Sequence, residues 1–268
     1  MEEQRFDVWA AGDAYERYMG RWSRLVAEVF VARLGAGSGL RWLDVGCGTG
    51  ALTAVVAARC RPRALVGLDR SPGFVRAARA AAPARFAVAD ALALPVRDAA
   101  CDAVVSGLAL NFLPSPQTAA AEAARVVRPG GLVATYVWDY AGGMEFLRRF
   151  WDAAAEADPS AAALHEGHRF PVCRPGPLRA LWTGAGLVDV AVDPIEVPTV
   201  FTGLADFWEP FLSGQGPAPG YVSALAPAAR DRLRDRLADT LPARPDGSIP
   251  LAARAWAVRG RRPERPRV

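Results

Sequence analysis

The chain contains no lysine, and all 32 of its basic residues are arginine. We attribute the net charge of +4 to a composition typical of GC-rich coding sequence rather than to a nucleic-acid surface. The one local basic cluster, residues 259–267, is interleaved with proline at the C-terminus, where we expect a disordered tail. The charge alone therefore predicts no nucleic-acid partner.

Cysteine is scarce and scattered. None of the four, Cys47, Cys60, Cys101 and Cys173, forms a C-x-x-C pair. This excludes a disulfide framework and a cysteine-rich zinc site, and we expect no metal. No apolar run reaches the ~18 residues needed to span a bilayer. The polar, acidic N-terminus is unlike a secretory signal. We therefore expect a soluble, cytoplasmic protein with no membrane partner.

The most informative motif in the sequence is a glycine-rich turn. The apolar run that ends at Val45 leads into Gly46-x-Gly48-x-Gly50, and an alanine-rich helical pattern follows over 51–59. A strand, a glycine turn and a helix N-terminus let the backbone approach a ligand closely. With Ala51 the glycines also fit the G-x-G-x-x-G/A form of dinucleotide-binding loops, so the turn alone does not identify the ligand.

Strands alternate with helices after this turn. Strands are predicted over 41–45, 64–68, 85–89, 103–106 and 132–138, and helices over 51–59, 72–81 and 118–127, with a tight turn at 128–131. This alternation implies a parallel sheet with helices on both faces. Beyond Tyr140 we expect helices at 144–157 and 178–185, strands at 187–197 and 249–258, and a mainly helical stretch at 201–241.

Three aspartates lie at the C-terminal ends of consecutive predicted strands. Asp44 stands where dinucleotide loops carry an apolar residue, and its carboxylate would repel a pyrophosphate but suits a positive amino group. Asp69 ends the second strand, where a carboxylate binds ribose hydroxyls. Asp90 precedes apolar Ala91, as expected for an adenine site. Each could be an ordinary cap or loop residue, but all three at one sheet edge favour a ligand.

These motifs resemble those of class I S-adenosylmethionine-dependent methyltransferases, in the small-molecule branch similar to the ubiquinone/menaquinone-biosynthesis enzymes. The resemblance rests on Leu43-Asp44-Val45-Gly46-Cys47-Gly48-Thr49-Gly50, Gly67-Leu68-Asp69, Ala89-Asp90-Ala91 and Arg128-Pro129-Gly130-Gly131. It implies an α/β fold: a doubly wound, seven-stranded, mostly parallel sheet with an antiparallel last strand, plus helical N-terminal and inserted cap elements.

The resemblance also implies a set of S-adenosylmethionine-binding residues. Asp44 and Gly46 would face the methionine part, Asp69 the ribose and Asp90 with Ala91 the adenine. The full candidate set is Asp44, Gly46, Cys47, Gly48, Asp69, Arg70, Asp90, Ala91 and Ser106, with Tyr18 and Arg21 closing an N-terminal helix over the cofactor. For the Cys47 side chain, a small buried thiol is the simpler interpretation.

The whole chain, 1–268, is expected to form a single methyltransferase domain. We divide it into an N-terminal helical lid (1–39), a cofactor-binding core (40–140), a cap with insertions (141–248, including the strand at 187–197), the last strand (249–258) and a disordered tail (259–268).

Aromatic residues give the only indication of the methyl acceptor. Among eight Trp, five Tyr and eleven Phe, only Phe74, Phe86 and Phe112 fall between residues 43 and 127. The others are core residues or line an apolar pocket for a flat or hydrophobic small molecule. Trp22, Leu108, Trp138 and Trp208 are our candidates for substrate binding, and by resemblance the acceptor is a natural product or a quinone-like molecule.

No catalytic residue is identified. Methyl transfer from a sulfonium is an in-line displacement, so a general base is needed only if the acceptor must lose a proton. The two histidines, His165 and His168, and Tyr18 are candidates for positioning the acceptor. The sequence leaves open whether carbon, nitrogen or oxygen is methylated, and it does not indicate an oligomeric state.

Three alternatives stay open. A nicotinamide-dependent oxidoreductase is disfavoured by Asp44. An RNA or protein methyltransferase is disfavoured because residues 106–112, Ser-Gly-Leu-Ala-Leu-Asn-Phe, lack the Asn/Asp-Pro-Pro-Tyr/Phe motif of amino-methyltransferases. A non-catalytic protein that only binds S-adenosylmethionine would keep the same fold and donor site.

Overall fold

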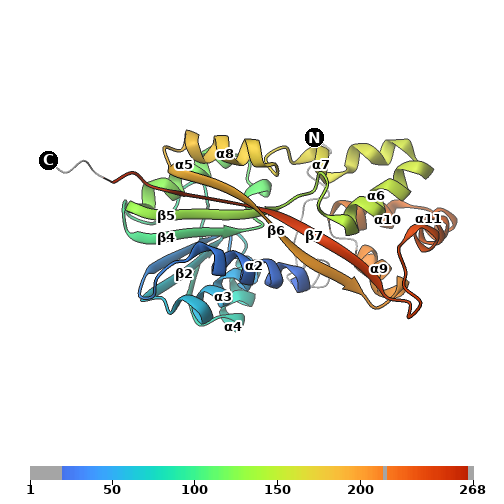
Figure 1. The fold of residues 1–268 in the computed structure, drawn as a ribbon, viewed down its shortest axis with the longest axis horizontal. Helices are drawn as coiled ribbons and strands as arrows, with labels where there is room; N and C mark the ends of the chain where they lie inside the picture. Colours follow the sequence, from blue (N-terminus) through green and yellow to red (C-terminus); the bar gives the residue numbers. More distant parts are fainter. Residues whose placement is uncertain (1–19, 214–215, 265–268) are drawn as a thin grey trace. The chain divides into compact units, whose positions relative to one another are not determined.

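The structure is a computed structural model that describes residues 20–213 and 216–264. The candidate Tyr18 lies outside these described residues. Within them, seven strands form one sheet in the order β3-β2-β1-β4-β5-β7-β6, with β7 antiparallel (Figure 1). The predicted fold class, a seven-stranded sheet with an antiparallel last strand, is confirmed.

The strands have the following bounds: β1 Arg41–Val45, β2 Ala64–Asp69, β3 Arg85–Val88, β4 Cys101–Gly107, β5 Val127–Trp138, β6 Val188–Phe201 and β7 Ile249–Arg261. β1 pairs in parallel with β2 and β4, so that Asp44 lies opposite Gly67 on one side and Val105 on the other. β3 continues the parallel arrangement beyond β2. The carboxyl ends of β1, β2 and β4 therefore meet at one edge of the sheet.

The chain divides into two compact units, each with its own helices. The sheet unit comprises Ser23–Val137, Val172–Ile195 and 256–264. It contains most of α2 (Arg21–Leu34), together with α3 (Ala51–Cys60), α4 (Pro72–Ala81), η3 (Leu110–Phe112), α5 (Pro116–Val126) and α8 (Pro175–Gly184). Within this unit, Figure 1 shows α3 and α4 on one face of the sheet and α5 and α8 on the other.

The aromatic unit comprises 20–22, Trp138–Pro171, 196–213 and 216–255. Its helices are α6 (Glu145–Ala157), η4 (Pro159–Leu164), α7 (Glu166–Arg169), α9 (Leu204–Trp208), η5 (Glu209–Ser213), α10 (Pro217–Ala224) and α11 (Pro227–Thr240). Its core contains a stack of buried rings. The ring centroid of Phe211 lies 4.6 Å from that of Phe146 and 4.3 Å from that of Phe150. The aromatic residues that the sequence concentrates after the first five strands thus build this core.

Local signals explain where two helices of the sheet unit begin. Ser71 Oγ accepts a hydrogen bond from the Phe74 amide, and Pro72 occupies the first turn of α4. Ser115 caps α5 in the same way, with Pro116 after it. The sequence predicts a helix start at 118, and the Ser-Pro cap moves it two residues earlier.

The tight turn predicted at 128–131 lies within β5, which begins at Val127. Cys101 of β4 pairs with Val127 and Ala103 with Leu132, so the chain bulges out of the ladder over these four residues. The Gly130 amide donates to the Arg262 carbonyl and the Arg262 amide donates to the Gly131 carbonyl. This pairing also continues β7 to Arg261, three residues beyond the predicted end of the last strand. Gly130, inside β5, has φ +71, where a side chain would be strained.

Arginines of the basic C-terminal cluster bond to backbone carbonyls within the sheet unit. The Arg262 guanidinium donates to the carbonyls of Arg125 and Val127, each at 2.7 Å. Arg261 donates to the Gly130 carbonyl at 3.0 Å. These contacts give Arg261 and Arg262 a role in holding the end of β7.

No helix in the described part of the chain is long and apolar enough to cross a membrane. The cytoplasmic localisation expected from the sequence stays a prediction.

Candidate functional site

The glycine turn after β1 packs tightly on one side and is open on the other. Gly46 has φ +72, and a Cβ there would lie 2.5 Å from the Ala109 Cβ, so only glycine fits. The amides of Gly46 and Cys47 both donate to the Leu68 carbonyl, which ties the turn to β2. Gly48 has φ +53, but nothing lies within 4 Å of its Cβ position. A ligand can therefore approach the backbone at Gly48.

The Asp44 side chain is fully buried, and only one of its two carboxylate oxygens has a hydrogen-bond partner. Its Oδ2 accepts a hydrogen bond from Thr53 Oγ1 at 2.5 Å, whereas its Oδ1 is buried without a partner. Burial raises the pKa of Asp44 to about 7, and the nearby Asp69 carboxylate raises it further, against the lowering effect of Thr53. A buried carboxylate oxygen without a partner is costly, and a cationic group of a ligand would satisfy it.

The raised pKa makes stability depend on pH. Asp44 ionises near 3.8 in the unfolded chain and near 7 in the folded one, so the folded state binds more protons between these values. Its contribution to stability is full below pH 3.8 and is lost as the pH rises through 7. Without ligand, we expect the free energy of unfolding of the wild type to fall by about 1.4 kcal/mol per pH unit between pH 5 and 6.5, relative to Asp44→Asn.

Urea titrations of both proteins at several pH values measure this difference. Taking the difference cancels the titration of groups that do not interact with Asp44. Parallel pH profiles for the two proteins would show that Asp44 is ionised in the folded state at pH 5.

Asp69 accepts hydrogen bonds from two backbone amides, one in the glycine turn and one at the start of α4. Oδ2 accepts from the Gly48 amide at 3.0 Å and Oδ1 accepts from the Ser71 amide at 2.8 Å. Each carboxylate oxygen can accept a second hydrogen bond, and the side chain is half-buried at the end of β2. Asp69 is thus fixed in direction and keeps capacity for a pair of ligand hydroxyls.

The remaining candidates of the sheet unit lie at the carboxyl ends of strands. Asp90 is exposed, and its Oδ1 accepts from the Leu92 amide at 2.9 Å, which shapes the turn around half-buried Ala91. Arg70 is exposed directly after Asp69. Ser106 is the penultimate residue of β4, and its Oγ lies 4.0 Å from the Cβ position of Gly46.

Leu108 occupies a strained backbone position directly after β4. Its φ is +58, although a left-handed conformation costs a residue other than glycine about 1–2 kcal/mol. Its amide donates to the Tyr136 carbonyl at 2.9 Å, which holds the turn in place. Such strain is often retained where a turn must present its backbone or side chains to a ligand.

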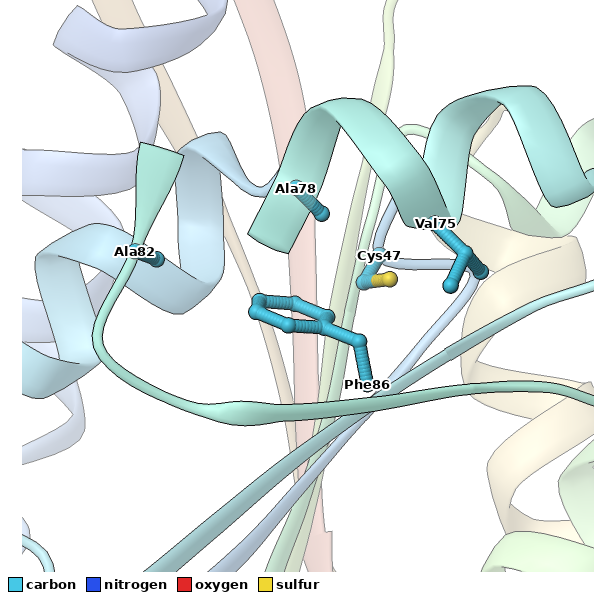
Figure 2. Packing of buried hydrophobic residues seen from close by; sticks show 5 residues of the cluster. All are labelled: Cys47, Val75, Ala78, Ala82 and Phe86. Atoms are coloured by element: carbon cyan, nitrogen blue, oxygen red, sulfur yellow. The ribbon is translucent and has the colours of Figure 1, made fainter. Parts of the chain in front are cut away.

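The Cys47 side chain is part of the buried core of the sheet unit. It is buried between Val75, Ala78, Ala82 and Phe86 (Figure 2). Burial strongly raises the pKa of its thiol. The side chain therefore behaves as a small core residue, and a contact of Cys47 with a cofactor would be made by its backbone.

Two candidates lie at the start of α2, in the aromatic unit. The Arg21 guanidinium donates to Asp206 at 2.9 Å and stacks over the rings of Trp22 and Phe201 at 4.8 and 4.7 Å. Trp22 is buried edge-on against Phe146 and Phe201, each at 5.2 Å. These contacts explain both residues structurally, so their ligand roles stay predictions.

The other substrate candidates are also largely buried. Trp138 at the end of β5 is 2% exposed, and Trp208 in α9 is 6% exposed with its ring 6.1 Å from Phe211. Leu108 is 8% exposed and belongs to the sheet unit. The structure thus groups Trp22, Trp138 and Trp208 in one unit and Leu108 in the other.

The two histidines lie together in the aromatic unit, with ring centroids 5.8 Å apart. His165 caps α7: its Nδ1 accepts from the Gly167 amide at 2.9 Å. Burial lowers the pKa of His165, and the neighbouring His168 lowers it further. While Nδ1 accepts this bond, the neutral ring carries its proton on Nε2, so His165 can donate a hydrogen bond but must break its cap to take a proton.

Within the described residues, no group of three or more His, Cys, Asp or Glu is placed to hold a metal ion.

Two residues that support the site were not anticipated from the sequence. Thr53 in α3 holds Asp44, and Ala109 after β4 packs against Gly46. Thr53 is the only hydroxyl residue in a helix otherwise made of apolar residues and arginine. A single polar side chain in such a helix could have indicated a polar contact at this position. Nothing local marks Ala109, because its role comes from a contact between distant segments.

Comparisons with known proteins identify similar sequences and folds. A family model described as a methyltransferase domain matches residues 43–135. An uncharacterized protein of Mycobacterium tuberculosis is 31% identical over 193 residues, which cover 68% of this chain and 69% of that protein. Trans-aconitate 2-methyltransferase of Methylobacterium radiotolerans is 34% identical over 151 residues, or 56% of each chain.

A solved structure shows the same fold. Phosphoethanolamine N-methyltransferase 2 of Haemonchus contortus, in complex with S-adenosyl-L-methionine, superposes with a TM-score of 0.58 at 17% identity and covers 94% of this chain and 57% of that one. Together with the glycine turn and the aspartates at the sheet edge, these matches show that the chain belongs to the class I S-adenosylmethionine-dependent methyltransferases.

Proposed function

We propose that the protein transfers the methyl group of S-adenosylmethionine to a small aromatic or hydrophobic metabolite. The observation that carries the choice of donor is the buried Asp44 Oδ1 without a partner, beside a glycine turn that is open at Gly48. A cationic amino group satisfies such an oxygen, whereas the pyrophosphate of a nicotinamide dinucleotide would be repelled by it. When bound, S-adenosylmethionine supplies a methyl group on a positively charged sulfur, ready for in-line displacement.

Different residues of the sheet unit bind different parts of this donor. Asp69 is fixed by the Gly48 and Ser71 amides and offers its remaining lone pairs to the two ribose hydroxyls. Asp90 and Ala91 accept the adenine at the turn that Asp90 shapes. Gly48 lets the ligand lie against the backbone, and Ser106 lies on the β4 side of the turn.

For the acceptor, support comes from composition and from relatives. The aromatic unit concentrates large apolar rings, among them Trp22, Trp138 and Trp208, which suit a flat or hydrophobic molecule. The name of one relative states a small organic acid, trans-aconitate, as its substrate. Binding then aligns the acceptor and excludes water, and His165, His168 and Tyr18 remain the candidates to position it.

An acceptor panel tests this proposal. The wild type is incubated with S-adenosylmethionine carrying a labelled methyl group and with phenols, hydroquinones, aromatic acids, tRNA and unrelated protein. We expect label in one or more of the small molecules. Label only in tRNA or protein would contradict the proposal and favour the alternative acceptors.

Trp208 offers a direct test of the substrate site. With an acceptor from the panel, Trp208→Leu is expected to raise the KM for the acceptor at least about fivefold while the affinity for S-adenosylhomocysteine stays unchanged. Phe150→Leu is the matched control, because Phe150 is fully buried in the same core and is not a candidate. Both variants lose packing, by about 1–3 kcal/mol, so equal effects on KM would show that Trp208 acts only structurally.

A further inference from the structure

A long irregular loop connects β3 to β4 and carries Asp90 and Ala91. Its 12 residues, 89–100, form no helix or strand, whereas most connections in compact domains have about 4–6 residues. Leu94 is the only buried residue of this loop, so apolar packing contributes little to its shape. The conformation in which Asp90 and Ala91 are presented therefore depends on hydrogen bonds.

Arg125 of α5 binds this loop at several positions. Its guanidinium donates to the carbonyls of Leu94 at 3.1 Å and Val96 at 2.9 Å. The Ala99 amide donates in turn to the Arg125 carbonyl at 3.1 Å. Ala99 has φ +56, a left-handed conformation that persists in a residue other than glycine only where the surroundings impose it. One residue of α5 thus fixes the second half of the loop.

Glu122, one turn earlier in α5, binds both the loop and Arg125. Its Oε2 accepts from the Leu94 amide at 2.7 Å. Its two carboxylate oxygens also accept from Arg125 Nε at 2.6 Å and from Arg125 Nη2 at 2.8 Å. This bidentate pairing orients the guanidinium plane, which a lysine ammonium cannot reproduce. We call Glu122 and Arg125 the α5 clamp.

The first contact of the α5 clamp directly follows the turn at Asp90. The Asp90 carbonyl accepts from the Ala93 amide at 3.2 Å, which closes this turn. Before the turn, the Ala89 amide donates to the Asp69 carbonyl of β2 at 3.0 Å. After it, Leu94 bonds to the clamp through both its amide and its carbonyl. The turn is therefore fixed by β2 on one side and by α5 on the other.

We propose that Glu122 and Arg125 are positioning residues for the adenine half of the methyl donor. This inference rests on the proposed function, in which Asp90 and Ala91 accept the adenine. In this role neither side chain of the α5 clamp contacts the donor. The clamp fixes the loop before the donor arrives, so that binding does not have to order it.

A ligand that differs only in its base tests this role. S-inosylhomocysteine carries a carbonyl oxygen where S-adenosylhomocysteine carries the exocyclic amine of adenine, and a carboxylate such as Asp90 accepts a hydrogen bond only from the amine. We expect the wild type to prefer S-adenosylhomocysteine in competition calorimetry. In Arg125→Lys, we expect this preference to fall at least about fivefold, mainly because S-adenosylhomocysteine binds more weakly.

A second variant keeps the test valid if Arg125→Lys does not fold. Glu122→Gln retains an acceptor oxygen for the Leu94 amide but removes the bidentate ion pair with Arg125, so its base preference should fall in the same direction. Thermal melting without ligand confirms that each variant is folded.

Two controls separate positioning from a general loss of stability. Arg41→Lys breaks another bidentate pair of the sheet unit, with Asp102, away from the loop. Asp98→Ala removes only the exposed end of the Arg125 network, since its side chain is 72% exposed. Both controls should keep the wild-type affinities for the two ligands.

The binding results decide the inference separately from the proposed function. Equal weakening of both ligands in Arg125→Lys would overturn the inference, because the clamp would then support the site as a whole. Unchanged affinities in this variant, or a wild type without base preference, would also overturn it and leave the proposed function intact. If the wild type binds neither ligand, the proposed function fails, and the inference fails with it.

Discussion

Asp69→Ala should weaken the binding of S-adenosylhomocysteine at least about a hundredfold. The proposed contacts are two hydrogen bonds from ribose hydroxyls to an ionised carboxylate, each worth about 1.5–3 kcal/mol. The loss is larger than these contacts alone because Asp69 also accepts from the amides of Gly48 and Ser71. Without it, the backbone amides of Gly48 and Ser71 lose their partner.

Calorimetry with two further variants sharpens this result. Asp69→Asn keeps one acceptor oxygen, but its NH₂ group faces one of the two backbone amides, so we expect intermediate to severe weakening. Asp98→Ala is the control, because Asp98 belongs to the same unit and its side chain is 72% exposed in an ion pair with Arg125. Asp98→Ala should bind like the wild type. Full retention of binding by Asp69→Ala would remove Asp69 from the site.

Alanine at Gly46 should mainly reduce stability, whereas alanine at Gly48 should mainly reduce ligand affinity. At Gly46, alanine adds a methyl 2.5 Å from the Ala109 Cβ and also strains a left-handed backbone at φ +72. Overpacking costs about 1–3 kcal/mol and the strained backbone about 1–2 kcal/mol, so we expect Gly46→Ala to lose about 3–5 kcal/mol of stability.

At Gly48 the same change meets open space. Only the left-handed backbone at φ +53 is strained, so Gly48→Ala should lose about 1–2 kcal/mol of stability. The new methyl instead occupies the side from which we propose that the cofactor approaches, and S-adenosylhomocysteine should bind at least tenfold more weakly. Urea unfolding and calorimetry on both variants measure this contrast. Equal stability losses, or unchanged ligand affinity of Gly48→Ala, would contradict the geometry of the turn.

The parts of the fold that the sequence predicts correctly are those with local signals. The Ser71-Pro72 cap, the glycine turn and the aspartates at the ends of β1 and β2 all depend on residues close together in the chain. The periodic apolar segments then suffice to predict the strand and helix alternation of the sheet unit, and the resemblance supplies the antiparallel last strand.

The parts that the sequence misses depend on contacts between distant segments. β5 begins five residues before its predicted start, and β7 ends three residues beyond its predicted end, because Gly130 and Gly131 pair with Arg262. Ala109 acquires its role only by meeting Gly46. The sequence shows where the aromatic residues are concentrated, but the ring stack of Phe146, Phe211 and Phe150 depends on contacts between α6 and η5.

The central claim is that the glycine turn and its aspartates bind S-adenosylmethionine and not a dinucleotide. Calorimetric titration of the wild type with S-adenosylhomocysteine and, separately, with NAD tests it most directly. We predict saturable binding of S-adenosylhomocysteine at one site per chain and no binding of NAD at the same concentrations. Binding of NAD without binding of S-adenosylhomocysteine would contradict the account.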